Sequence, residues 1–60
     1  MKTNLQSALE IIAAMKTVIG LERYEHRLDN LYKIGALSAR ELATLDAARI
    51  DRIIHLETAA

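Results

Sequence analysis

Hydrophobic residues between positions 3 and 34 recur at the spacing of an α-helix, but they change sides partway along it. On a helical wheel at about 100° per residue, an early set and a late set fall on opposite sides, and Gly20 lies at the crossover. A helix with two apolar faces in series needs two different packing partners. The early set is Leu5, Ala8, Leu9, Ile12, Met15 and Ile19. The late set is Leu21, Tyr24, Leu28, Leu31 and Tyr32.

The uninterrupted spacing predicts one continuous first helix over residues 3–34. Thr3 or Asn4 can cap the free amides of its first turn. Gly35 is suited to the left-handed position that ends a helix.

A break at Gly20 is the alternative. It would fold residues 3–18 back and complete a three-helix monomer. A glycine inside a helix costs only about 1 kcal/mol. Because no residue beside Gly20 has the pattern of a new cap, and no residues are left over for a loop, the sequence favours the continuous helix.

The second helix has a well-defined start. Ser38 and Glu41 have the spacing of a capping box, and Leu37 and Leu42 that of a hydrophobic staple. A turn over residues 35–38 and a helix over 39–57 follow from this pattern. Two helices joined by so short a turn form an antiparallel hairpin.

Folding the chain about that turn places the late apolar set of the first helix against the second helix. In this register Leu28 lies opposite Leu45, and Tyr24 lies opposite Arg49. The predicted hairpin core consists of Val18, Leu21, Tyr24, Leu28, Leu31, Leu42, Leu45, Ile50, Ile53 and Leu56.

The early set, from Leu5 to Ile19, finds no partner in such a hairpin. An exposed apolar patch of this kind is unusual for a monomer. We therefore expect an all-α single domain over residues 1–60 that pairs through this face into a homodimeric four-helix assembly. The alternative is that the same face enters the groove of a target protein as an amphipathic helix.

Composition supports a small helical domain and removes several kinds of chemistry. The chain has no cysteine, so disulfides and thiol chemistry are excluded. Its formal net charge is zero, with no basic block that suggests phosphate binding. Glu10 and Lys16 interrupt the run that a signal peptide would need, which favours a cytoplasmic protein with no membrane segment.

Candidate catalytic and metal-binding groups are sparse. Glu22 and His26 are four residues apart, as are Asp51 and His55, and both pairs are typical of exposed helix surfaces. No glycine-rich phosphate loop or catalytic triad is present. The sequence predicts no catalytic residue, no metal and no cofactor.

Asp46 and Arg49 interrupt the apolar stripe of the second helix. Buried charges are usually paired, so these two are expected to pair with each other, with Arg49 also near Tyr24. Their expected role is to fix the register of the hairpin, and contact with a partner is the alternative.

Nucleic-acid binding is an alternative function. The apolar residues Leu42, Ala43, Ala47, Ile53 and Leu56 lie near the spacing of a helix-turn-helix, although the turn glycine is missing. Zero net charge counts against phosphate binding.

A resemblance points in the same direction. Leu37-Ser38, Glu41-Leu42-Ala43, Ala48, Arg52 and Leu56 resemble the middle of the small enterobacterial Hha/YmoA proteins. The resemblance implies a partner of a nucleoid-associated repressor. Ala47-Ala48-Arg49-Ile50-Asp51-Arg52 keeps only fragments of the family's Ala-Ala-Asp-His-Arg signature, so no family is assigned. In shape the expected dimer is similar to Rop, a plasmid regulator, without a shared motif.

The favoured function is that of a non-enzymatic helical interaction protein. We expect a regulator, inhibitor or adaptor of a larger protein, of the kind that phages and plasmids encode, by analogy of type alone. The expected partner surface is the exposed ridge of the second helix, formed by Arg40, Thr44, Asp51 and His55.

Overall fold

A computed structural model describes residues 2–59, which form three α-helices and no β-strand. The helices are α1 (Asn4–Ala14), α2 (Val18–Lys33) and α3 (Ala39–Thr58). The prediction of an all-α chain is confirmed. Met1 and Ala60, the ends of the predicted domain, lie outside the described residues.

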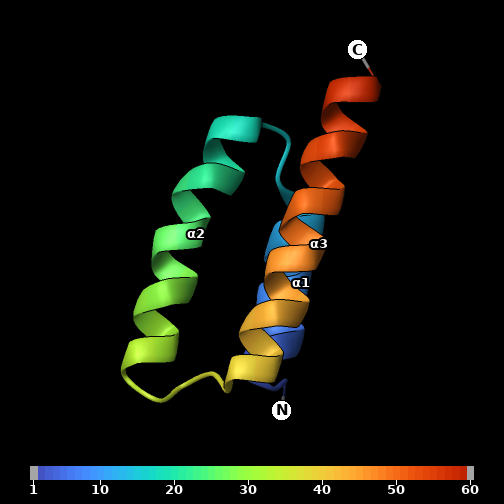
Figure 1. Ribbon diagram of the computed structural model, residues 1–60. Coiled ribbons are helices and arrows are strands. Elements are labelled where there is room, and N and C mark those ends of the chain that lie inside the picture. Colours follow the sequence, from blue (N-terminus) through green and yellow to red (C-terminus); the bar gives the residue numbers. More distant parts are fainter. Residues whose placement is uncertain (1, 60) are drawn as a thin grey trace.

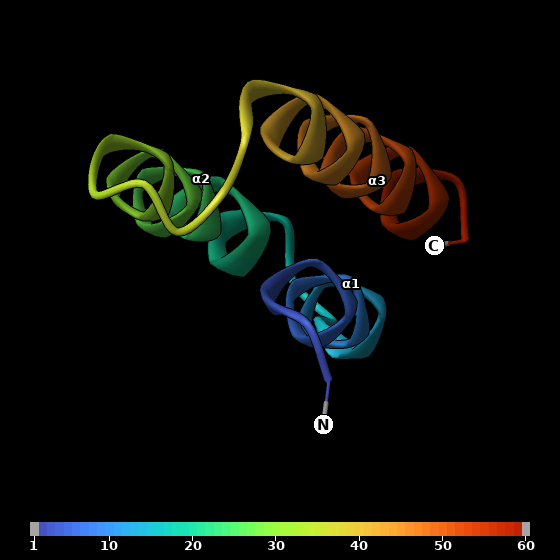
Figure 2. The ribbon, with the colours of Figure 1, turned by 90° about the horizontal axis from the view of Figure 1, so that it is seen from below.

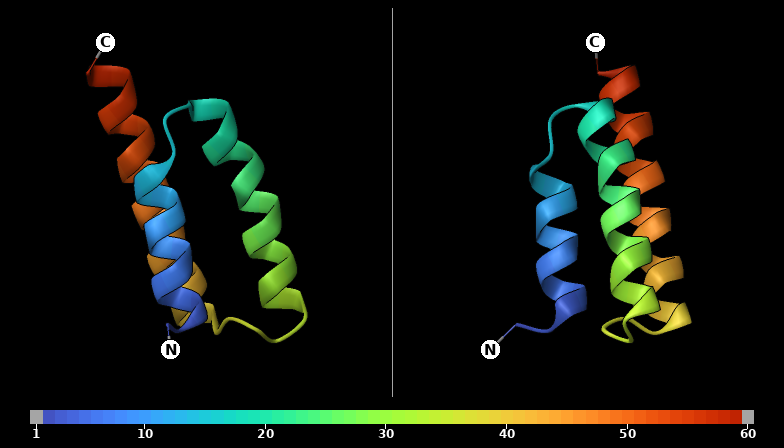
Figure 3. Two further views of the ribbon diagram at one scale, coloured as in Figure 1. Left: turned by 180° about the vertical axis from the view of Figure 1, so that it is seen from behind. Right: turned by 90° about the vertical axis from the view of Figure 1, so that its left-hand side faces the viewer.

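The three helices run up, down and up beside one another (Figure 1). Seen from below, they occupy the corners of a triangle (Figure 2). α3 packs against both other helices, whereas α1 and α2 touch each other much less. The last turns of α3 extend beyond the end of α1 (Figure 3).

The prediction of one continuous helix over residues 3–34 is wrong. The chain leaves the helix at Met15 and re-enters it at Val18, so α1 and α2 are separate. Met15 and Thr17 both have extended backbones, with ψ angles of 137° and 144°. The chain therefore reverses direction here, close to the alternative that placed the break at Gly20.

Side chains stabilise both ends of this break. The Thr17 hydroxyl accepts a hydrogen bond from the Gly20 amide at 3.2 Å and so caps α2. Arg52 Nε, from α3, donates to the Met15 carbonyl at 3.1 Å and satisfies an acceptor at the end of α1. A Cβ added at Gly20 would lie 2.8 Å from Thr17 Oγ1. Gly20 therefore matters because it leaves room for the cap.

Reversal of the chain brings the early apolar set into the core of its own molecule. Ala8 and Ile12 retain only 3% and 2% of their exposure. Leu5, Leu9 and Met15 are partly buried against the same core. Full burial of an isoleucine stabilises by about 1.5–3 kcal/mol. The broken helix covers this face without a second molecule, whereas the continuous helix would leave it exposed.

Ile19 does not follow the rest of the early set. It remains 58% exposed, because it lies beyond the break on the outer side of α2. The predicted dimer face is thus divided between the core and the surface.

The loop between α2 and α3 has the predicted local structure. Gly35 takes a positive φ of 82°. The Ser38 hydroxyl accepts from the Glu41 amide at 3.1 Å, and the Ser38 amide donates to the Glu41 carboxylate at 2.9 Å. Leu37 is buried. The Asn4 side-chain amide donates to the Ala36 carbonyl at 3.1 Å, which attaches the start of α1 to this loop.

The contact between α2 and α3 is centred on aliphatic residues. Leu21, Leu28 and Leu45 are fully buried and Tyr24 nearly so. Ile50 differs from the expectation: it is 50% exposed, since it lies about 140° from Leu45 around α3. The remaining predicted core residues are partly buried: Val18, Leu31, Leu42, Ile53 and Leu56.

Burial of Ile12 predicts a clear contrast with its neighbour. Replacing Ile12 with alanine should lower the free energy of unfolding by about 2–4 kcal/mol, or unfold the chain. The same change at Ile11, which is 44% exposed, should have little effect. Urea denaturation followed by circular dichroism measures both. The loss should not vary with protein concentration, because the covering residues belong to the same chain. A concentration-dependent loss would instead support a dimer.

The cap on α2 gives a second prediction. Thr17→Ala should cost about 1 kcal/mol of stability, because the Gly20 amide loses its acceptor. Thr17→Ser retains the hydroxyl and serves as the control in the same denaturation experiment. Equal stability of all three proteins would show that the cap does not contribute to the reversal.

Candidate interaction surfaces

A cationic side chain lies buried between α2 and α3. Arg49 is 8% exposed. Its guanidinium lies 3.8 Å from Glu25 of α2 and 3.8 Å from Asp46 of α3. Arg49 Nε and Asp46 Oδ1 are buried atoms without a hydrogen-bond partner. The structure thus brings the predicted pair together and adds Glu25 to it.

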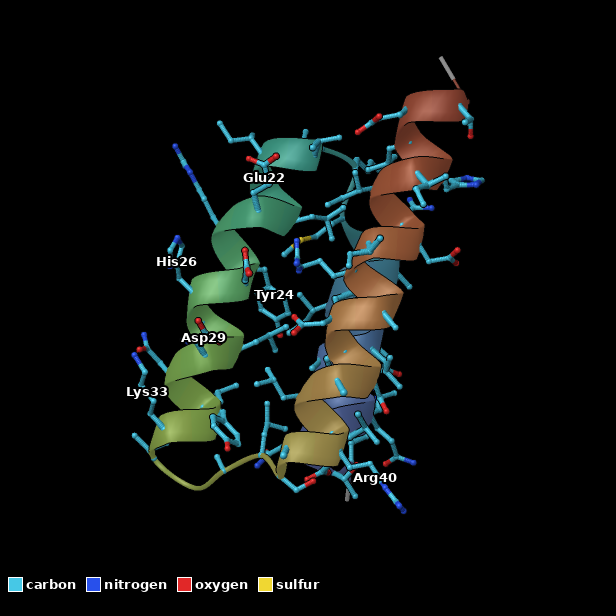
Figure 4. The ribbon with its side chains drawn as sticks, viewed as in Figure 1. Glu22, Tyr24, His26, Asp29, Lys33 and Arg40 are labelled. Atoms are coloured by element: carbon cyan, nitrogen blue, oxygen red, sulfur yellow. The ribbon has the colours of Figure 1, made fainter. Side chains whose placement is uncertain are left out.

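Tyr24 lies beside this cluster. Figure 4 shows its side chain directed from α2 toward α3. Burial raises the pKa of its phenol above the usual value, and the nearby charge of Arg27 lowers it in part. Tyr24 is therefore a neutral packing residue at neutral pH.

The outer side of α3 carries a second apolar line that does not contribute to the core. Ile50 and Ile54 are 50% and 55% exposed. Ala43 and Ala47 are exposed as well. These four residues, at spacings of i, i+4, i+7 and i+11, lie on one helix face. We call them the outer stripe.

Carboxylates lie beside the outer stripe. Glu22, Glu25 and Asp29, at i, i+3 and i+7, form one line along α2, which we call the acidic row. Glu22 and Asp29 face the viewer in Figure 4, whereas His26 and Lys33 extend from the edge of α2 that lies away from α3. The acidic row and the outer stripe are both on the side of the α2–α3 pair away from α1. We call this side, with Asp46 and Glu57 of α3, the front face.

A shallow groove runs between α1 and α3 on another side of the molecule. Its volume is about 380 Å³. The groove is lined by Leu9, Ile12, Ala13, Ala48, Asp51, Arg52 and His55.

The predicted ridge on α3 only partly overlaps this groove. Arg40, Thr44, Asp51 and His55 are all exposed, but only the last two line the groove. The Thr44 hydroxyl donates to the Arg40 carbonyl at 3.0 Å, so its hydrogen is already used within the helix.

Residue types that can ligate a metal ion are scattered over the described part of the chain. Within residues 2–59, no three histidine or carboxylate side chains gather where they could hold a metal ion. Glu22 faces the viewer in Figure 4, whereas His26 extends from the edge of α2 away from α3. Each of the helices in the same range is too short or too polar to cross a bilayer.

Comparison with known proteins gives no family. No protein-family model matches the chain, and neither a curated protein nor a solved structure is similar to it. The resemblance of residues 37–56 to the Hha/YmoA proteins therefore remains a local similarity.

Sequence reasoning missed the front face because it looked for one apolar stripe per helix. α3 carries more apolar residues than a single stripe can hold. Ile54 and the alanines of the outer stripe were the available signal, since they recur on the side opposite Leu45. The role of Arg52 at the end of α1 has no local signal.

Arg49 provides a third prediction. Arg49→Ala should lower the free energy of unfolding by about 1–3 kcal/mol, because packing and charge pairing are lost together. Arg49→Met keeps the apolar stem and should stay within about 1 kcal/mol of the natural protein. Arg40→Ala, at an exposed position, is the control in the same urea titration. If the methionine variant is as unstable as the alanine variant, the charge rather than the stem carries the effect.

Proposed function

We propose that this chain is a non-enzymatic helical interaction protein that binds a larger protein and acts as its regulator, inhibitor or adaptor. The observation that carries the proposal is the exposure of Ile50 and Ile54 on α3. The core is already filled by Leu21, Leu28 and Leu45, so these isoleucines do not contribute to it. Contiguous exposed apolar side chains with polar margins are typical of protein-binding surfaces.

The main reason for expecting a homodimer does not hold in the structure. The homodimer was inferred from an uncovered face on the first helix, and Ala8 and Ile12 of that face are covered by the same chain. This part of the face is therefore covered without a second copy. We accordingly propose the outer stripe of α3 as the partner surface. It replaces both the expected ridge of Arg40, Thr44, Asp51 and His55 and the alternative face from Leu5 to Ile19.

Nucleic-acid binding has less support. Carboxylates lie along α2 beside the outer stripe, and they would repel phosphates. The helix-turn-helix spacing falls on residues 42–56, all within the single helix α3, so no turn separates two helices there. A cytoplasmic location belongs to the same proposal, based on Glu10 and Lys16, which interrupt the apolar run that a signal peptide would need.

Chemical crosslinking in the cells that produce the protein tests this proposal. The natural chain should yield a crosslinked complex with a larger protein. Changing Ile50 and Ile54 together to aspartate should abolish the complex while circular dichroism shows an intact fold. Ile11→Asp, an equally drastic change at an exposed position of α1, should preserve it. A natural chain that forms no complex, or a complex unaffected by the double change, would contradict the proposal.

A further inference from the structure

The front face combines the two features from which a partner's chemistry can be inferred. Its apolar part is the outer stripe, with Ile50 and Ile54 about half exposed. Its charged part is the acidic row of Glu22, Glu25 and Asp29, with Asp46 and Glu57 on α3. We propose that the front face binds a basic amphipathic helix of a partner protein. This inference rests on the proposed function and specifies its surface and its ligand.

The outer stripe suits an approaching helix. α3 is a helix of 20 residues, and its stripe follows the i, i+4, i+7 pattern that helix-in-groove contacts use. Alanines at positions 43 and 47 permit close approach of a backbone, whereas Ile50 and Ile54 offer larger contact surfaces. An apolar stripe on a partner helix would therefore lie along α3, closest to it at the alanine end.

The charges of the front face determine which residues should flank the apolar stripe of the partner helix. Glu22 and Asp29 face outward from the front of α2, and His26 and Lys33 extend from the edge of α2 that lies away from α3 and the outer stripe (Figure 4). Charges interact over a Debye length of about 8 Å at physiological salt. Lysines or arginines beside the partner's apolar stripe would lie within this range of the acidic row.

Arg49 makes the acidic surface more rigid. It lies beneath the front face, 3.8 Å from both Glu25 and Asp46, and it is nine-tenths buried. Asp46 is 40% exposed on its side chain and Glu25 50%. Each carboxylate thus approaches a fixed cation from within while it remains open to a partner's cation from outside. Such preorganised charges lose little freedom on binding.

Other occupants fit the front face less well. The carboxylates of the acidic row would repel anionic lipids and nucleic acids. A second copy could place its outer stripe against this one with the two α3 helices antiparallel. That symmetric arrangement brings both acidic rows to the same side of the pair, where carboxylates would face carboxylates, and like charges across an interface are unfavourable.

The test uses the full chain and a synthetic amphipathic helix of leucine and lysine, about 18 residues or 27 Å long. A peptide with glutamate in place of lysine is the control. Fluorescence anisotropy should detect binding of the lysine peptide only, and raising salt should weaken it. The double change Glu22→Lys with Asp29→Lys, and separately Ile54→Asp, should each weaken binding by about tenfold or more. Asp51→Lys replaces an acidic residue outside the front face and should leave the affinity for the lysine peptide within about twofold of the natural protein's.

Four results would overturn the inference. The first is that the lysine peptide does not bind, and the second is that the glutamate peptide binds equally well. The third is that Asp51→Lys weakens binding as much as the front-face changes do. The fourth is that sedimentation shows a dimer that Ile54→Asp dissociates. The last result would assign the surface to a second copy. Crosslinking in cells separates the two proposals: a complex that survives the Glu22→Lys and Asp29→Lys changes but not the isoleucine changes keeps the proposed function and refutes the basic helix.

Discussion

The fold depends on covering the apolar side of α1 with residues of the same chain. Ile12 lies at the centre of that contact and is almost completely buried. A straight continuation into α2 would keep a few more backbone hydrogen bonds but would leave this side in water. Since buried aliphatic area is the dominant stabilising contribution to folding, reversal of the chain at Met15–Thr17 is favoured. The positions of α2 and α3 around a shared core follow from it.

Local sequence signals identified the parts of the fold that are determined locally. Ser38, Glu41 and Gly35 specify their own backbone geometry, and the structure has it. The break between α1 and α2 has no such signature. Met15 and Lys16 continue a helical pattern, and Thr17 acts as a cap only because the chain has already turned. Arg52 stabilises that turn from 37 residues away in the sequence.

The same limit applies to the surface. The expected ridge on α3 was located from polar residues, and it is exposed as such residues usually are. The outer stripe could be recognised only once Leu45 was known to mark the inner side of α3. With that side known, Ile50 belongs to a separate exposed surface and not to the edge of the core. Whether an apolar residue lies in the core or on the surface depends on its tertiary neighbours. Helical periodicity alone does not identify those neighbours.

The order of the helices along the chain affects how the molecule forms. α1 is synthesised first, yet its main partner is α3, the last helix. The side chain that satisfies the Met15 carbonyl belongs to Arg52. On the ribosome, α1 therefore emerges before the helix against which it packs, and it has no docking surface until α3 has been released. A helix of 11 residues is marginal alone in water, so α1 becomes stably helical only after α3 has been synthesised.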